Sequence, residues 1–311
     1  MTTRLMRGWV MVAPMALVVL CGHPGWAAKK TARSVKPPKV EKTAEQLRQE
    51  VAAAPDQAQL QYELGVALAK EGKPQDAVNA LKKATELKND FTAAHYTLGA
   101  VYYSLKRPDQ AKTSFRRAVE LDSRHAKAHL GLGTLWLQEK KYADAVKELE
   151  AALRADSRLP AAHYQLGLAH FYQGQYRPAA ASLRQAIALG KRDGETHYTL
   201  GNVYRKLGQW EQAAAAFLDA TKAEPKNAKT WNELGYVKYE QKEFKAAQKA
   251  WETAVSLDPQ SAEAHYGLGL VHLQAKRWDQ AQAVYEQLRS LDAELAADLL
   301  SELEAKRPKE K

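Results

Sequence analysis

A fixed period of 34 residues is the feature that most constrains this chain. A Leu-Gly dipeptide at residues 64–65 is followed by six more at successive steps of 34 residues, the last at 268–269. With its glycine numbered as position 8, the seven units cover residues 58–295, about three quarters of the 311 residues. A unit that recurs at such a period buries its apolar face against its neighbouring copies, so the sequence predicts a repeat architecture.

The small and apolar positions of each unit have helical spacing. Positions 4, 7, 8 and 11 share one face of a first helix, and positions 20, 24 and 27 share one face of a second helix. Position 20 is alanine in all seven units, and position 24 is large and apolar, from Leu81 to Tyr285. Turns such as KEGKPQD supply the glycine and proline that end a helix. Each unit is therefore predicted to be a helix–turn–helix.

This pattern resembles the tetratricopeptide repeat (TPR), whose motif has Trp or Leu, Leu-Gly, Tyr, Ala, Phe or Tyr, Ala and Pro at positions 4, 7–8, 11, 20, 24, 27 and 32. The chain departs from it mainly at position 11, which is Lys238 in unit six and His272 in unit seven, and at position 32. The resemblance implies an all-α fold, a right-handed α-solenoid of seven repeats with an extra helix at each end. The expected segments are an N-terminal capping helix at 43–57, repeats at 58–91, 92–125, 126–159, 160–193, 194–227, 228–261 and 262–295, a C-terminal capping helix at 296–305 and a basic tail at 306–311.

A histidine recurs at position 4 and raises the question of a metal site. Equivalent residues of neighbouring repeats lie on the order of 10 Å apart, whereas the ligands of a zinc ion lie about 2 Å from the metal. In the TPR family this position holds a large packing residue. We therefore expect packing histidines with a satisfied ring nitrogen, and we expect no metal and no cofactor. The histidines are His95, His129, His163, His197 and His265.

The N-terminus has the order of an export signal. A basic start is followed by an apolar run at residues 8–20 and by Gly25 and Ala27, small residues before a cleavage point. The run is shorter than the roughly 20 residues of a usual membrane span. We expect cleavage after Ala27 and a periplasmic or envelope-associated protein. Two alternatives stay open, an uncleaved membrane anchor and lipidation of Cys21, the only cysteine.

The net charge of +10 belongs to the ends of the chain. Residues 28–42 form a Pro- and Lys-rich segment predicted to be an extended linker, and residues 306–311 are also basic. The segment between them, residues 43–305, is formally neutral, which argues against a nucleic-acid partner. The linker lysines could contact anionic lipid or cell wall, or the linker could be only a solvated spacer.

The resemblance also implies where a ligand binds. In TPR proteins positions 2, 5, 9, 12 and 13 of the first helices line a concave groove, and here that stripe is rich in tyrosine. Tyrosine offers a large contact area with a polar tip, although single rings could instead only pack against adjacent helices. Tyr198 replaces the lysine of the carboxylate clamp of chaperone-binding TPRs, so no chaperone-tail binding is predicted. The candidate residues are Tyr62, Tyr96, Tyr103, Tyr164, Phe171, Tyr172, Tyr198, Asn202, Arg205, Lys206, Lys229, Asn232, Tyr236, Tyr239 and Tyr266.

The sequence carries no catalytic signature. It has no Gly-rich phosphate loop, nucleophile elbow or HExxH motif, so we predict no catalytic residues and no enzyme. We expect a non-enzymatic scaffold or assembly factor of the bacterial cell envelope that binds a partner protein or peptide in the groove. The alternative function is binding of an envelope polysaccharide, with the tyrosines stacked on sugar rings.

Overall fold

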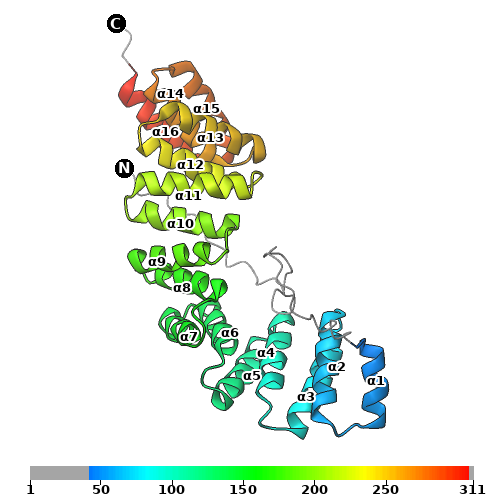
Figure 1. The fold of residues 1–311 in the computed structure, drawn as a ribbon. Helices are drawn as coiled ribbons and strands as arrows, with labels where there is room; N and C mark the ends of the chain where they lie inside the picture. The colour runs from blue at the N-terminus through cyan, green and yellow to red at the C-terminus, as the bar shows by residue number, and fades with distance from the viewer. Residues whose placement is uncertain (1–41, 308–311) are drawn as a thin grey trace, which may run out of the picture. The chain divides into compact units, whose positions relative to one another are not determined.

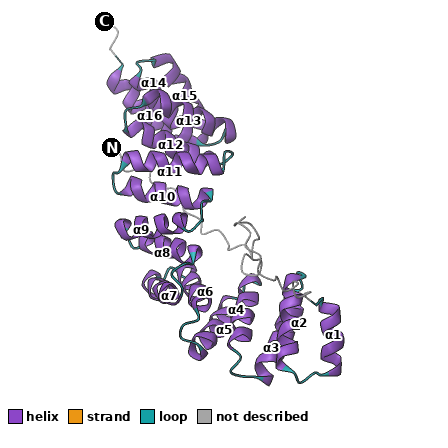
Figure 2. Ribbon diagram, in the orientation of Figure 1, coloured by secondary structure: helices purple, strands orange, loops and turns teal. Residues whose placement is uncertain are grey.

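The computed structural model describes residues 42–307, and every regular element in that range is an α-helix (Figure 1 and Figure 2). The predicted signal peptide 1–27, residues 28–41 of the predicted linker and residues 308–311 lie outside the described residues. Within the described part, no helix is both long enough and apolar enough to span a membrane. The described residues form two compact units, 42–157 and 158–307.

The unit 42–157 contains an N-terminal helix and three helix pairs. The first helix begins after Thr43, whose side chain accepts a hydrogen bond from the Gln46 backbone N–H while the Gln46 side chain accepts one from the Thr43 backbone N–H. This reciprocal capping box fixes the start of the helix. The helices are α1 (Ala44–Ala53), α2 (Ala58–Lys70), α3 (Pro74–Leu87), α4 (Thr92–Ser104), α5 (Pro108–Leu121), α6 (Ala126–Gln138) and α7 (Tyr142–Ala155).

The unit 158–307 contains four helix pairs and a final helix. That last helix begins three residues before the expected segment 296–305, because the Asp292 carboxylate accepts hydrogen bonds from the N–H groups of Glu294 and Leu295 and caps it there. It packs against both helices of the seventh repeat. The helices are α8 (Pro160–Tyr172), α9 (Tyr176–Ala188), α10 (Gly194–Lys206), α11 (Trp210–Ala223), α12 (Ala228–Glu240), α13 (Phe244–Leu257), α14 (Ala262–Gln274), α15 (Trp278–Leu291) and α16 (Ala293–Lys306). The predicted all-α helix–turn–helix repeat is confirmed.

A glycine-to-side-chain contact holds the two helices of a repeat together. A Cβ added to Gly65 would lie 2.5 Å from Cγ of Leu81, so the position-24 side chain fills the space that the glycine leaves. The position-20 alanines are 0 % exposed in all seven repeats, since they lie at the same crossing. In the seventh repeat Gly269 instead faces Leu299 of α16, which shows how the final helix closes the array.

A left-handed residue closes the turn within each repeat. Position 15 has positive φ in all seven turns, and glycine adopts it in three of them with φ between 70° and 75°. Lysine adopts it in the other four, with φ between 56° and 63°. The tight turn is therefore kept even where the residue has a Cβ and the conformation is unfavourable. The lysines are Lys106, Lys140, Lys242 and Lys276.

Two of the large rings at position 24, Phe115 and Trp251, reach two repeats at once. Trp251 is 2 % exposed and lies between Gly235 of its own repeat and Gly267 of the next. A Cβ on Gly267 would lie 2.2 Å from Cε2 of the indole. The indole Nε1 of Trp251 donates a hydrogen bond of 3.0 Å to Oδ1 of Asn232. Where position 24 is the smaller Leu81, the next repeat has a threonine in place of this glycine. At Trp251 and Leu81 the side-chain volumes at these two positions are therefore complementary, whereas Phe217 is followed by Glu233.

This complementarity predicts the effect of adding one methyl group. Gly267→Ala should lower the free energy of unfolding by about 1–3 kcal/mol, because the rigid indole has no room for the Cβ. In a Trp251→Leu background the same change should cost less, since a leucine leaves more space. Chemical denaturation of the four proteins measures this coupling, and strictly additive effects would contradict the account.

Candidate functional site

The recurring position-4 side chain closes the turn that enters the repeat in five of the seven repeats, with His163 and His197 as the other two. The ring of His95 donates from Nε2 to the carbonyl of Asn89 at 3.0 Å. His129 and His265 make the same bond at 3.1 Å to the carbonyl six residues earlier. Trp231 does so from its indole nitrogen and Gln61 from its amide, at 2.8 and 3.0 Å. The position thus satisfies a turn carbonyl, and no group of three or more His, Cys, Asp or Glu within residues 42–307 is arranged to hold a metal.

The candidate tyrosines of the unit 42–157 pack against neighbouring rings. Tyr62 lies 5.0 Å from Phe91 between ring centroids. Tyr96 is half-buried, 4.8 Å from the ring of His125, and burial raises the pKa of its hydroxyl to about 12. The hydroxyl of Tyr103 accepts a hydrogen bond of 2.7 Å from Nε2 of Gln138. These side chains hold adjacent helices together.

The candidate rings of α8 and α10 also have packing partners. Tyr164 is only 5 % exposed, with the ammonium of Lys191 4.5 Å from its ring centroid. Burial raises the pKa of its hydroxyl. Phe171 lies 5.6 Å from Tyr172, its neighbour in the chain. Tyr198 stands edge-on to Phe217 at 5.7 Å. Little of Tyr164 remains available to a ligand.

The structure brings several candidate polar residues together around one guanidinium. Nε of Arg205 lies 3.3 Å from a carboxylate oxygen of Glu233, and one of its terminal nitrogens donates to Oδ1 of Asn202, also at 3.3 Å. The guanidinium lies 5.6 Å from the ring centroid of Tyr236. Sequence reasoning missed Glu233, because it stands at position 6, outside the groove stripe. Its signal was an acid at position 6 in the repeat that follows an arginine at position 12.

This ion pair changes the expected role of Arg205. The two side chains are 11 % and 15 % exposed, and burial raises the pKa of Glu233 although the charge of Arg205 opposes that shift. The sequence suggested that Arg205 could bind a ligand carboxylate. In the structure Arg205 already forms an ion pair with a carboxylate of its own chain. Asn232 likewise accepts from Trp251, while Lys229 is exposed and Lys206 half-buried.

Three tyrosines of α12 and α14, Tyr236, Tyr239 and Tyr266, form what we call the tyrosine face. Each is half-buried. Burial raises the pKa of the Tyr236 and Tyr266 hydroxyls to about 12, and nearby carboxylates, including Glu240 and Asp298, contribute to the shifts. The supporting rings are Trp210, 6.3 Å from Tyr236, and Phe244 and Trp251, 5.4 and 5.8 Å from Tyr239.

A shallow crevice lies beside the tyrosine face. It joins the buried ion pair to the start of α14 and lies over the indole of Trp251. Its lining residues are Arg205, Asn232, Glu233, Tyr236, Trp251, Glu263 and Gly267. The crevice and the tyrosine face together form the candidate binding site in the unit 158–307.

The buried pair predicts a stability effect that is separate from binding. Arg205→Ala leaves the Glu233 carboxylate buried without its partner and should lower the free energy of unfolding by about 3 kcal/mol at pH 7. The double variant Arg205→Ala/Glu233→Ala should recover most of that loss. Denaturation that finds the single and double variants equally destabilised would contradict the ion pair.

The same variant has a predicted pH dependence. The folded-state pKa of Glu233 is raised, so its charged form costs stability above that pKa, and the cost disappears as the pH falls through it. The deficit of Arg205→Ala should therefore shrink as the pH falls from 7 toward the ordinary carboxyl range near about 4.3. A deficit that stays constant with pH would contradict this electrostatic origin.

Comparison with protein families identifies the repeat. A profile described as tetratricopeptide repeat matches residues 40–91, 96–160 and 232–296, more than half of the chain. Two further TPR profiles match residues 68–118 and 201–242, and a profile of anaphase-promoting complex subunit 3 matches residues 138–220. Comparison with curated protein sequences gives no match.

Solved structures share the fold. YrrB, described as a TPR protein with an unusual peptide-binding site, is 24 % identical, with 64 % of this chain and 99 % of that chain covered and a TM-score of 0.56. Pseudomonas aeruginosa PilF is 20 % identical, with 67 % and 94 % covered and a TM-score of 0.58. The C-terminal part of a TPR repeat-containing protein from Cytophaga hutchinsonii is 16 % identical, with 77 % and 99 % covered and a TM-score of 0.62. The chain is an all-α TPR solenoid, and it belongs to the tetratricopeptide repeat family.

Proposed function

We propose that this protein is a non-enzymatic scaffold that binds an extended segment of a partner protein on the tyrosine face. The observation that carries the proposal is the set of three half-buried tyrosines, of which Tyr236 and Tyr239 pack against other aromatic rings. Rings whose orientation is already restricted lose little entropy when a ligand binds, and tyrosine and arginine are frequent binding anchors.

The family supports this proposal in general terms. TPR proteins mediate protein–protein interactions and assembly, and the structure of YrrB is described as having a peptide-binding site. In the present chain the buried Arg205–Glu233 pair lies next to Tyr236. This pair lines the crevice beside the tyrosine face, and its two charges already satisfy each other. Most of the binding energy is therefore expected to come from the rings.

The proposal predicts which substitutions weaken binding. Tyr236→Ala and Tyr266→Ala should each weaken capture of a partner protein by about 2 kcal/mol, the typical loss at an aromatic anchor. The matched control is Leu218→Ala, which removes a side chain that is 45 % exposed on α11, a second helix. The measurement is quantitative pull-down from envelope extracts, with folding checked by circular dichroism. Equal capture by all variants would contradict the proposed surface.

A parallel measurement separates the alternative ligand class. Affinity electrophoresis in envelope polysaccharide tests whether the tyrosines stack on sugar rings. Loss of polysaccharide retention in the two tyrosine variants, with protein capture unchanged, would replace the protein-binding proposal by polysaccharide binding.

We also propose that the protein acts after export, in the bacterial periplasm or envelope. The support is the basic, apolar and small-residue order of residues 1–27, which lie outside the described residues. Intact-mass analysis of the protein from its native host should show a chain that begins at Ala28. A full-length chain in the cytoplasmic fraction would contradict export, and a membrane-bound chain that retains its N-terminus or carries lipid on Cys21 would replace cleavage after Ala27.

A further inference from the structure

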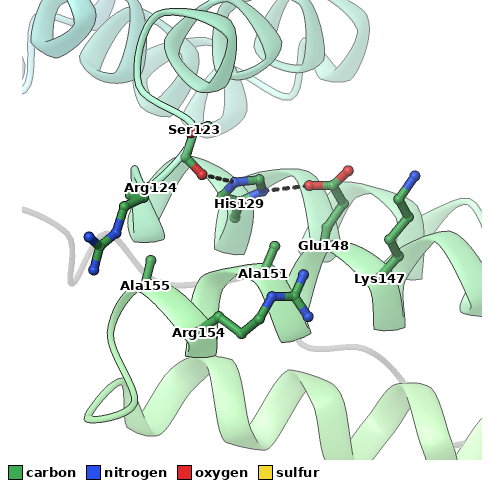
Figure 3. Close-up of a pocket in the computed structure, with 8 residues that line it drawn as sticks. All are labelled: Ser123, Arg124, His129, Lys147, Glu148, Ala151, Arg154 and Ala155. Carbon is green, nitrogen blue, oxygen red and sulfur yellow. Dashed lines mark hydrogen bonds and ion pairs between the residues drawn. The ribbon is translucent and has the colours of Figure 1, made fainter.

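A second concave site lies in the unit 42–157. It is a cavity of about 360 Å³ between the turn before α6 and the outer side of α7. Figure 3 shows Arg154 reaching beneath the side chains of His129 and Glu148, with Arg124 on one side of the cavity and Lys147 on the other. The lining residues are Ser123, Arg124, His129, Lys147, Glu148, Ala151, Arg154 and Ala155.

The third repeat differs from the other six at the positions that form this cavity. Its positions 22, 26 and 29 are Lys147, Ala151 and Arg154, and no other repeat places a cation at both position 22 and position 29. Position 23 of this repeat is Glu148, the only acidic residue at position 23 among the seven repeats. The residues at position 23 in the other repeats are Ala80, Ser114, Ser182, Ala216, Ala250 and Val284. The cavity is therefore a property of this repeat and not of the repeat architecture.

The one acid of the cavity is matched by a histidine. Nδ1 of His129 lies 2.7 Å from the Glu148 carboxylate, and Nε2 lies 3.1 Å from the Ser123 carbonyl oxygen. Because a carbonyl and a carboxylate can only accept, His129 makes both hydrogen bonds when its ring is protonated as an imidazolium. The hydrogen bond from Glu148 accordingly raises the pKa of His129. The charge of Glu148 is thus balanced by His129, so the net charge of the cavity comes from its other side chains.

Those other charged side chains are all cations. Among residues 42–307, Arg124 and Lys147 form no side-chain ion pair with a carboxylate. Arg154 has one loose contact, 3.9 Å from Glu150, with its side chain 70 % exposed. Arg154 and Lys147 stand seven residues apart on α7, with Ala151 between them leaving an open floor. Three incompletely satisfied cations thus surround a hollow.

We propose that this cavity binds a phosphate group, held by Arg154 and Lys147 with Arg124 at the rim. A guanidinium and an ammonium donate short charge-assisted hydrogen bonds to phosphate oxygens, and the negative charge of a phosphate group complements the excess positive charge of the cavity. The phosphate comes either from a soluble phosphate monoester or from a phospholipid headgroup, and both offer anionic non-bridging oxygens to the cavity. The site does not depend on the proposed function of the tyrosine face.

The test compares two variants of the full chain that lose equal charge. Lys147→Ala/Arg154→Ala removes the two cations of α7, whereas the control Lys82→Ala/Lys83→Ala removes two exposed lysines of α3. Inorganic phosphate and pyrophosphate are titrated calorimetrically at constant ionic strength. Phosphatidylcholine vesicles with and without phosphatidylglycerol are tested by co-sedimentation. The basic residues 29–42 are the same in all proteins, so their contribution cancels in the comparison.

The wild type and the α3 control should bind alike, and the α7 variant should bind at least about tenfold more weakly. Weaker binding of phosphate or pyrophosphate by the α7 variant supports a phosphate ester as the ligand. Weaker binding by that variant confined to phosphatidylglycerol vesicles supports a lipid headgroup. The proposal is overturned if the two variants behave identically in both arms, or if the wild type binds neither probe. Circular dichroism and thermal unfolding show that both variants are folded.

Discussion

The close crossing of two helices over a glycine is the contact on which the rest of this structure depends. In the first repeat a Cβ on Gly65 would lie 2.5 Å from Leu81, so no other residue fits without moving that side chain. The position-20 alanines at the same crossings are fully buried. Because the crossing recurs every 34 residues, each first helix presents the same positions on the same side. Tyr236, Tyr239 and Tyr266, at positions 9, 12 and 5 of two successive first helices, therefore lie within one stripe.

The fold was largely predictable because it depends on local spacing. Small residues at fixed positions imply close helix crossings, and seven copies in one register are compatible with few folds other than a helical repeat. The start of the last helix was less predictable, since it depends on the capping carboxylate of Asp292. The histidines at position 4 were expected to pack with a satisfied nitrogen. Their bond to a carbonyl six residues earlier required the conformation of the turn.

The candidate site was less predictable because it depends on contacts between repeats. The stripe of first-helix positions contained Tyr236 and Tyr266, but it also contained Tyr164, whose ring is almost completely covered. Helical spacing shows on which face of the helix a side chain lies, but it does not show which side chains of neighbouring helices cover it. Glu233 lies outside the stripe, so pattern reasoning gave Arg205 no partner. The role of a residue in this array is set by its neighbours in the next repeat.

The two proposed sites use the same scaffold in different ways. The tyrosine face lies on first helices, and its rings pack both within the sixth repeat and against Trp210 of the fifth repeat. The cationic cavity lies on the outer side of a second helix and depends on substitutions confined to one repeat. A repeat fold permits both, because each repeat tolerates changes at positions that do not form the helix crossing. Function in such a protein resides in the departures from the repeat.

Site-specific photo-crosslinking in the native host tests the central claim most directly. A photoreactive phenylalanine derivative replaces Tyr236 or Tyr266 on the first helices, and in separate proteins it replaces the exposed Lys245 or Glu252 of α13. The account predicts one discrete protein adduct, shared by the two first-helix positions and absent from the two second-helix positions. An adduct formed only from α13, or none from Tyr236 and Tyr266 while the wild type still captures its partner, would contradict binding on the tyrosine face.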